Sequence, residues 1–205
     1  MVYIYLAEGF EEVEALTAAD VLRRAGVDAK LVSISESLKV TGAHGICVET
    51  DLLMKQCNYE NCRMLVLPGG MPGTLNLGAS EQLCRKLQEF AASPDKKVAA
   101  ICAAPMVLGK LGILQGKKAT IYPGMEEHLA GAENSSEKVV ISGNVITSKG
   151  PGTAMDFALT LAGVLCGEKT AENLKSDMIF GEKGRRDRQS DRDWQLEEGR
   201  RFYEL

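Results

Sequence analysis

The amino-acid sequence predicts an α/β protein built on a mainly parallel sheet. Short aliphatic or β-branched runs alternate with longer segments of helical periodicity through the first 180 residues, which is the pattern of repeated strand and helix units. No internal repeat or low-complexity linker interrupts this alternation. The chain has 205 residues, of which 45% are hydrophobic, so it is long enough to bury the core of one such domain.

Strands are expected where an apolar run is short and rich in aliphatic or β-branched side chains. The run that follows Lys97 is apolar at every position up to Ile101, as expected for a parallel strand covered on both faces. In chain order the predicted strands are Val2–Ala7, Ala29–Ile34, Gly45–Glu49, Met64–Leu67, Lys97–Ile101, Lys118–Tyr122, Val139–Ile141 and Val145–Thr147.

Helices are expected where apolar residues recur every three or four positions. In the first helix Ala18, Val21, Leu22 and Ala25 form one apolar stripe. Pro105 suits the first turn of a later helix, because its missing N–H leaves no hydrogen bond unmade there. In chain order the predicted helices are Glu11–Ala25, Glu81–Ala91, Ala103–Lys110, Gly124–Leu129, Gly152–Val164 and Lys169–Lys175.

Charge and hydropathy exclude several classes of function. The formal net charge is −4 and the pI is near 5.4, and basic residues are interspersed with acids, so no nucleic-acid-binding surface is expected. The longest apolar stretch, Val98 to Gly109, is too short to span a bilayer. The N-terminal residues lack the basic region of a signal peptide. We therefore expect a cytoplasmic protein without a membrane partner.

The cysteine pattern argues against a metal centre. The six cysteines form no CxxC pair, there are two histidines, and His44 and Cys47 form an HxxC pair of a kind that is more often structural than metal-binding. In a reducing compartment each thiol is then either a small buried hydrophobe or a reactive nucleophile.

The last 25 residues differ in character from the rest. From Gly181 to Leu205, 14 of 25 residues are charged and apolar periodicity is weak. We therefore interpret residues 1–180 as the domain and residues 181–205 as a charged C-terminal extension. Trp194, Phe202 and Tyr203 are candidates to anchor this extension on a surface, and a solvated or partly helical tail is the alternative.

Cys102 is the strongest candidate for a reactive residue. It lies where the buried strand ending at Ile101 passes through small residues into the helix that starts around Pro105. This is the arrangement of a nucleophile elbow, in which the field of the helix N-terminus is expected to lower the pKa of the thiol. The alternative is a packed core cysteine after a buried strand.

Two glycines follow another predicted strand at the same edge of the sheet. The backbone N–H groups of Gly69 and Gly70, together with that of Ala103, are candidates for an oxyanion hole beside Cys102. The alternative is a plain turn, because Pro-Gly-Gly is common in turns.

Glu14 is an acid on the apolar stripe of the first helix. A buried carboxylate there would have a raised pKa and would be suited to donate a proton or to act as a general acid and base. The alternative is an acid that complements the helix dipole and reaches solvent.

Four segments, in this order and spacing, resemble the DJ-1/ThiJ/PfpI superfamily, and specifically its bacterial DJ-1-like (ThiJ/YajL) branch. They are AEGFEEVEA (7–15), LPGG (67–70), AAICAAP (99–105) and TSKGPGT (147–153). The resemblance covers about residues 1–180. It implies a flavodoxin-like three-layer sandwich, a homodimer, and a reactive cysteine on a nucleophile elbow that faces a glutamate on a helix.

The resemblance also implies roles for particular residues. Cys102 and Glu14 would form the catalytic pair, and the amides of Gly69, Gly70 and Ala103 would surround the sulfur. Pro151 would line the pocket, and Arg24 would lie near the dimer interface. Where many members place a histidine beside the cysteine, this chain has Tyr122, so a mechanism that requires a Cys–His pair is not expected.

The function that the resemblance implies is a cofactor-free conversion of methylglyoxal to lactate of the glyoxalase III type, with deglycation of glycated protein or nucleotide as a related activity. The substrate class is then a small dicarbonyl. The alternative is a non-enzymatic role as a redox sensor or holdase chaperone, in which Cys102 oxidises to a sulfinate.

Overall fold

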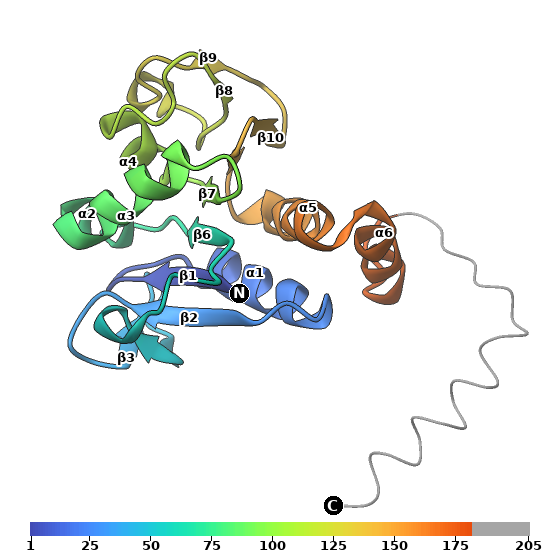
Figure 1. The fold of residues 1–205 in the computed structure, drawn as a ribbon, viewed down its shortest axis with the longest axis horizontal. Helices are drawn as coiled ribbons and strands as arrows, with labels where there is room; N and C mark the ends of the chain where they lie inside the picture. Colours follow the sequence, from blue (N-terminus) through green and yellow to red (C-terminus); the bar gives the residue numbers. More distant parts are fainter. Residues whose placement is uncertain (182–205) are drawn as a thin grey trace, which may run out of the picture.

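The computed structural model describes residues 1–181, and its centre is a seven-stranded sheet (Figure 1). Every pairing in this sheet is parallel except that between the edge strand β10 and its neighbour β11. The order across the sheet is β10 (Val139–Ser142), β11 (Val145–Ser148), β7 (Lys97–Ile101), β6 (Met64–Leu67), β1 (Val2–Leu6), β2 (Ala29–Ser33) and β5 (Leu52–Leu53). The predicted α/β class with a mostly parallel sheet is therefore confirmed.

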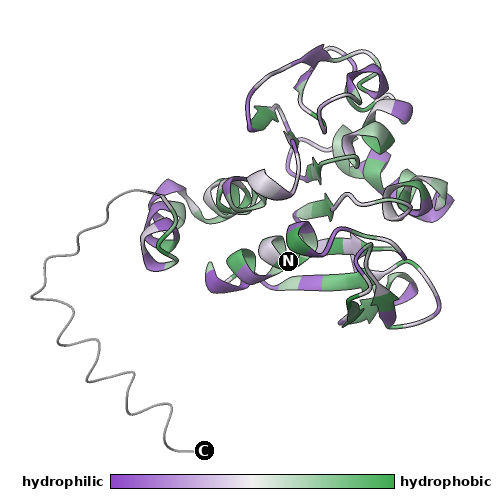
Figure 2. Cartoon of the chain, turned by 180° about the vertical axis from the view of Figure 1, so that it is seen from behind, coloured by the Kyte–Doolittle hydropathy of each residue, from purple (hydrophilic) through white to green (hydrophobic). Residues whose placement is uncertain are grey.

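Helices cover both faces of the sheet, which gives three layers (Figure 1). The helices are α1 (Glu12–Arg24), α2 (Gly73–Ala79), α3 (Glu81–Ala92), α4 (Pro105–Lys110), α5 (Ala154–Cys166) and α6 (Glu168–Asp177). Successive side chains of a strand point to opposite faces. Ile4 of β1 accordingly packs with α1 and α5, whereas Tyr3 and Tyr5 pack with α2, α3 and α4. Figure 2 shows these strands as hydrophobic, with hydrophilic residues on the outer parts of the helices.

Several predicted elements differ from those observed. Residues 45–49 lie outside the main sheet, in a small hairpin of β3 (Lys39–Thr41) and β4 (Cys47–Glu49). The predicted strand 118–122 shrinks to β8 (Lys118–Ala119), which pairs only with β9 (Glu133–Asn134). The predicted helix 124–129 was wrong, because only the 3-10 turn Glu126–His128 forms there. Helix α2 was not predicted.

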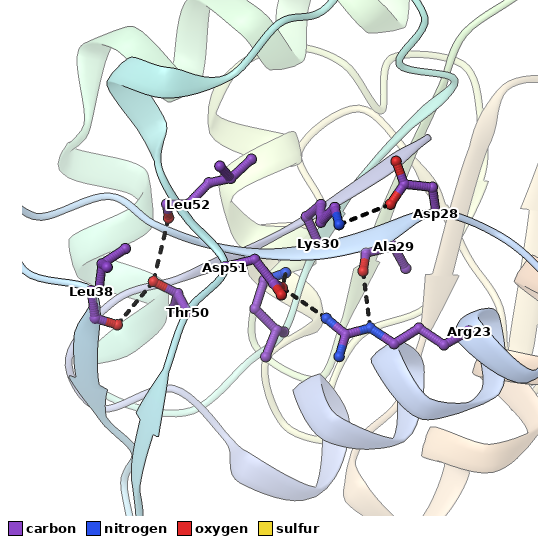
Figure 3. A network of polar contacts seen from close by, with 9 residues as sticks. Arg23, Asp28, Ala29, Lys30, Leu38, Thr50, Asp51 and Leu52 are labelled. Carbon is purple, nitrogen blue, oxygen red and sulfur yellow. Dashed lines mark hydrogen bonds and ion pairs between the residues drawn. The ribbon is translucent and has the colours of Figure 1, made fainter.

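The far end of α1 is fastened to the sheet by Arg23 (Figure 3). Its Nε donates to the carbonyl oxygen of Ala29 at 3.0 Å, and its guanidinium pairs with Asp51 at 2.7 Å. Asp51 Oδ2 in turn accepts the N–H of Leu31 at 2.7 Å. These contacts fix the axis of α1, and with it the position of the acidic residues at the opposite end of the helix.

Within residues 1–181, no helix has both the length and the apolar character that a bilayer crossing requires.

Candidate active site

Cys102 occupies a strained turn between β7 and α4. Its φ is +63°, a left-handed conformation that is unfavourable for a residue with a side chain. Two hydrogen bonds hold the turn: the Cys102 N–H donates to the Ser148 carbonyl oxygen at 2.9 Å, and the Tyr122 N–H donates to the Cys102 carbonyl oxygen at 2.9 Å. Neighbouring segments therefore maintain the strain, and the turn has the backbone form of a nucleophile elbow.

Glu14 lies in the first turn of α1 and is 1% exposed. Its Oε2 accepts the backbone N–H of Gly69 at 2.7 Å, while Oε1 is buried without a hydrogen-bond partner among the described residues. Burial raises the pKa of this carboxyl to about 7, although the hydrogen bonds from Gly69 and the Cys102 thiol oppose the rise. The acid predicted on the buried face of the helix is therefore buried, and its pKa is raised as expected.

Gly69 lies against both members of the pair. A Cβ at this position would stand 2.6 Å from Cβ of Cys102, 2.9 Å from Oε2 of Glu14 and 3.0 Å from the sulfur. The close approach of the carboxyl and the thiol therefore depends on the absence of a side chain at residue 69. The N–H of Gly69 is bonded to Glu14, so its predicted place in an oxyanion hole is wrong: this amide holds the acid.

Gly70 and Ala103 are the amides on the sulfur. Hydrogen bonds from both backbone N–H groups lower the pKa of the Cys102 thiol. Gly70 has a φ of +88°, and a Cβ there would collide with the backbone of residues 9–11. The loop before α1 thus packs directly on the glycine turn after β6, which brings Glu14 to the site.

The thiol is harder to ionise than the sequence suggested. Burial, followed by the charge of Glu14 and its hydrogen bond, raises the pKa of Cys102 to about 12, against the smaller effect of the Ala103 and Gly70 amides. The prediction of a lowered pKa was wrong, because a thiolate and an ionised Glu14 would place two negative charges together in a buried site. If the proton moves from the sulfur to Glu14, a single charge remains.

The other predicted site residues fall into two groups. Tyr122 and Pro151 line a recess of about 300 Å³ beside the elbow, together with Pro123, Lys149, Gly150, Gly152 and Thr153. The Tyr122 side chain is 47% exposed.

Arg24 lies at the opposite end of α1 from Glu14, about 15 Å along the helix axis, and pairs with Asp20 at 2.7 Å. Within one chain Arg24 is therefore not part of the site.

Sequence reasoning missed two contributors to this region. Lys149 was quoted in a motif but was not assigned to the recess. Ser148 is fully buried, and its hydroxyl lies 2.7 Å from that of Thr153, which fixes the turn before α5. The sequence signal was a serine at the end of a buried strand followed by a lysine, at the edge of the sheet where Cys102 lies.

Among residues 1–181, Glu11, Glu12 and His44 form a group whose ligand atoms lie within 4.8 Å of one another. The Glu12 carboxylate already accepts the N–H of His44 at 2.8 Å and contacts Nδ1 of the same residue at 2.8 Å. This hydrogen bond and the charges of both acids raise the pKa of His44. The group therefore fastens the loop around residue 44 to the start of α1.

Comparison with known proteins places these features in a family. The DJ-1/PfpI family model matches residues 1–163. The chain is 37% identical over 184 residues to Protein DJ-1 homolog B of Arabidopsis thaliana, a match that covers 87% of this chain and 41% of that protein, so the chain spans less than half the length of this relative. It is 33% identical over 155 residues to a deglycase of Pyrococcus abyssi, which covers 74% of this chain and 90% of that protein.

A solved structure agrees in fold. The structure of oxidized DJ-1 from Toxoplasma gondii matches with a TM-score of 0.84 and 34% identity, and the match covers 88% of this chain and 98% of that one. The family model, the relatives and the fold all lead to one conclusion: the chain belongs to the DJ-1/PfpI family.

Proposed function

We propose that this protein converts small dicarbonyls such as methylglyoxal to hydroxy acids without a cofactor, with Cys102 as the nucleophile and Glu14 as the general acid and base. The observation that carries the proposal is the pair itself. A buried carboxyl with a pKa of about 7 contacts a thiol on a strained turn, and one of its oxygens, Oε1, has no hydrogen-bond partner within residues 1–181. A base with a pKa near neutrality is suited to accept and return protons at neutral pH.

The first step is addition of the sulfur to the aldehyde carbon. Glu14 accepts the thiol proton as the C–S bond forms, and the aldehyde oxygen becomes an oxyanion. The N–H groups of Gly70 and Ala103, which point at the sulfur, are placed to donate to this oxygen. Return of the proton from Glu14 to the oxyanion gives a neutral hemithioacetal and restores the carboxylate.

The second step moves a hydrogen between the two carbons. Glu14 removes the proton from the carbon bound to sulfur, which gives an enediolate, and then delivers this proton to the neighbouring carbon. The hydroxyl proton of the former aldehyde carbon passes to the oxygen of that neighbouring carbon. The product is a thioester of lactate on Cys102. Water hydrolyses the thioester, releases lactate and returns the thiol, so the net reaction is methylglyoxal plus water to lactate.

Deglycation is a related activity of the same site. The relative from Pyrococcus abyssi is named a deglycase. In a hemithioacetal or aminocarbinol formed from methylglyoxal, the bound thiol or amine would first leave with a proton from Glu14, which regenerates the aldehyde. Cys102 would then add to this aldehyde as above, so the thiol or amine is released free of its adduct.

The test is steady-state turnover of methylglyoxal by purified protein in the absence of glutathione, with lactate identified by NMR. Lactate should form with the wild type and be lost in Cys102→Ser and Glu14→Gln. Cys84→Ser is the matched control, because Cys84 is also partly buried but lies on α3. Full turnover by Glu14→Gln would exclude the proposed base, and no turnover by the wild type would contradict the enzymatic function.

A second candidate function is redox sensing, with chaperone activity as its output. The relative from Toxoplasma gondii was solved in an oxidized form. In this chain a protonated Glu14 would donate a hydrogen bond to a sulfinate on Cys102, and its pKa of about 7 keeps much of it protonated at neutral pH. This function requires peroxide as the oxidant.

We also propose that the protein is a homodimer. Val13 and Leu16 of α1 are 51% and 38% exposed, and Ile46 is 54% exposed. The Ile46 N–H contacts Glu12 at 3.4 Å, so these apolar side chains lie around the same end of α1. An exposed apolar surface of this kind is suited to bind a second copy of itself about a two-fold axis.

A further inference from the structure

A groove of about 660 Å³ lies between β10, α5 and α6, away from the Cys102 site. Its apolar lining includes Leu159, Val164 and Phe180. Ile141 of the edge strand β10 also lines it and is 54% exposed. A large apolar side chain open to solvent beside a groove of ligand-binding size indicates a surface that another segment covers.

The chain itself leaves from the rim of this groove. Phe180 lines the groove, and Gly181 is the last described residue. Trp194 stands thirteen positions after Gly181 in the sequence, which allows a reach of up to about 45 Å. The length of α6 is about 15 Å, so Trp194 can reach any part of the groove from this attachment point.

The charges of the groove and of the following segment are complementary. The charged residues that line the groove are Asp156, Glu168, Glu172 and Lys175, so acids outnumber bases. Within residues 1–181, Asp156 pairs with Lys138, and neither Glu168 nor Glu172 has an ion pair. Residues 183–188, KGRRDR, contain four basic residues and one acid. Since this run begins two positions after Gly181, with Glu182 between them, its positive charges can lie along the acidic side of the groove while later residues supply apolar groups.

We propose that residues 182–205 of the same chain bind in the groove between β10, α5 and α6, with Trp194 in contact with Ile141 and Phe180. Attachment at the rim favours this segment over a separate partner, because a tethered segment binds at a high effective concentration. An aromatic side chain with one polar atom is also suited to a half-open apolar site. The proposal is independent of the chemistry of Cys102.

The test uses the intrinsic fluorescence of the full-length chain, in which Trp194 is the only tryptophan. Trp194 in the wild type should emit at shorter wavelength than free indole in water and should resist quenching by acrylamide. Ile141→Asp should move the emission to longer wavelength and increase quenching. Leu75→Asp is the matched control, because Leu75 is 52% exposed and lies on α2 outside the groove.

A charge reversal gives a second, independent measurement. Glu172→Lys on the exposed side of α6 should weaken binding of the basic run and increase quenching of Trp194, with a smaller effect at high salt. Emission of a fully exposed indole in the wild type would overturn the proposal, as would unchanged spectra in both groove variants. A blue shift that grows with protein concentration would assign the groove to the tail of a second copy and would also overturn it.

Discussion

Gly69 packs against both Cys102 and Glu14, because a Cβ there would stand 2.6 Å from Cβ of Cys102 and 2.9 Å from Oε2 of Glu14. The same residue donates its N–H to that carboxylate oxygen. One glycine thus sets the separation of the pair and holds the acid in place.

Gly69→Ala should therefore reduce activity far more than it reduces folding. The new methyl group must push the thiol and the carboxyl apart, and a misplacement of about 1 Å costs about 100-fold in rate. Methylglyoxal turnover and thermal unfolding measured on the same preparation test this. Gly78→Ala is the control, since the nearest atom to a Cβ there is a side-chain methyl of Val107 at 3.3 Å. Equal losses of activity in the two variants would contradict the role of Gly69.

The raised pKa of Glu14 also predicts how stability depends on pH. The carboxyl titrates near 4.5 in the unfolded chain and at about 7 in the folded one. Its contribution to stability is therefore fully present below pH 4.5 and is lost as pH rises through about 7, by about 3 kcal/mol. Glu14→Gln cannot ionise, so its melting temperature relative to wild type should rise between pH 5 and pH 8. A constant difference between the two proteins would show that Glu14 titrates normally.

Replacing Glu14 by glutamine should increase the rate at which Cys102 is alkylated, although it should decrease methylglyoxal turnover. At pH 8 the ionised carboxylate raises the pKa of the thiol, so Glu14→Gln should speed alkylation of Cys102 by iodoacetamide while turnover is lost. At pH 6, where Glu14 is mostly protonated, the two proteins should react at similar rates. Mass-spectrometric peptide mapping measures this, and exposed Cys47 serves as an internal control. Slower alkylation of Cys102 in the variant at pH 8 would exclude charge repulsion as the cause.

The central strands could be predicted from sequence because they are buried on both faces. The observed bounds of β6 and β7 match the predictions to the residue. Helix α2 could not be predicted, since it begins at Gly73 and contains Gly78, both poor helix formers. Tertiary contacts stabilise it instead: Leu77 is fully buried, and the Gly73 N–H donates to the Gly9 carbonyl oxygen at 3.1 Å.

The Cys102 and Glu14 pair and the raised pKa of Glu14 could be predicted from the sequence, but the direction of the Cys102 pKa and the role of Gly69 could not. Helical spacing was enough to put Glu14 on the buried face of α1, and the small residues around Cys102 were enough to predict the turn. The direction of the thiol pKa depends on the distance between residues 14 and 102, which no local pattern contains. The direction in which the Gly69 N–H points is likewise set by the packing of the loop before α1 on the turn after β6.

The proposed dimer makes a further prediction for the outer face of α1. Val13→Asp places a charge in the proposed apolar interface and should give a monomer by light scattering at micromolar concentration. Leu75→Asp, which changes a residue of the same exposure on α2, should leave the mass unchanged. A wild-type protein with the mass of one chain would contradict the homodimer itself.

The last prediction concerns oxidation of Cys102 and the hydrogen bond that a protonated Glu14 would donate to the product. Peroxide converts a thiolate first to a sulfenate and then to a sulfinate, adding one oxygen at each step as water leaves. A protonated Glu14 can donate to the sulfinate, and the amides of Gly70 and Ala103 that point at the sulfur can donate to it as well. Mild peroxide should therefore add two oxygens to Cys102 in the wild type and stop there.

Glu14→Leu lacks the donor, so under the same conditions its Cys102 should remain at the sulfenate or proceed to the sulfonate. All six cysteines are free in the structure, and intact mass with peptide mapping distinguishes these products. A disulfide between Cys102 and another cysteine as the main product would exclude the sulfinate, and an identical product pattern in Glu14→Leu would show that the amides alone hold it.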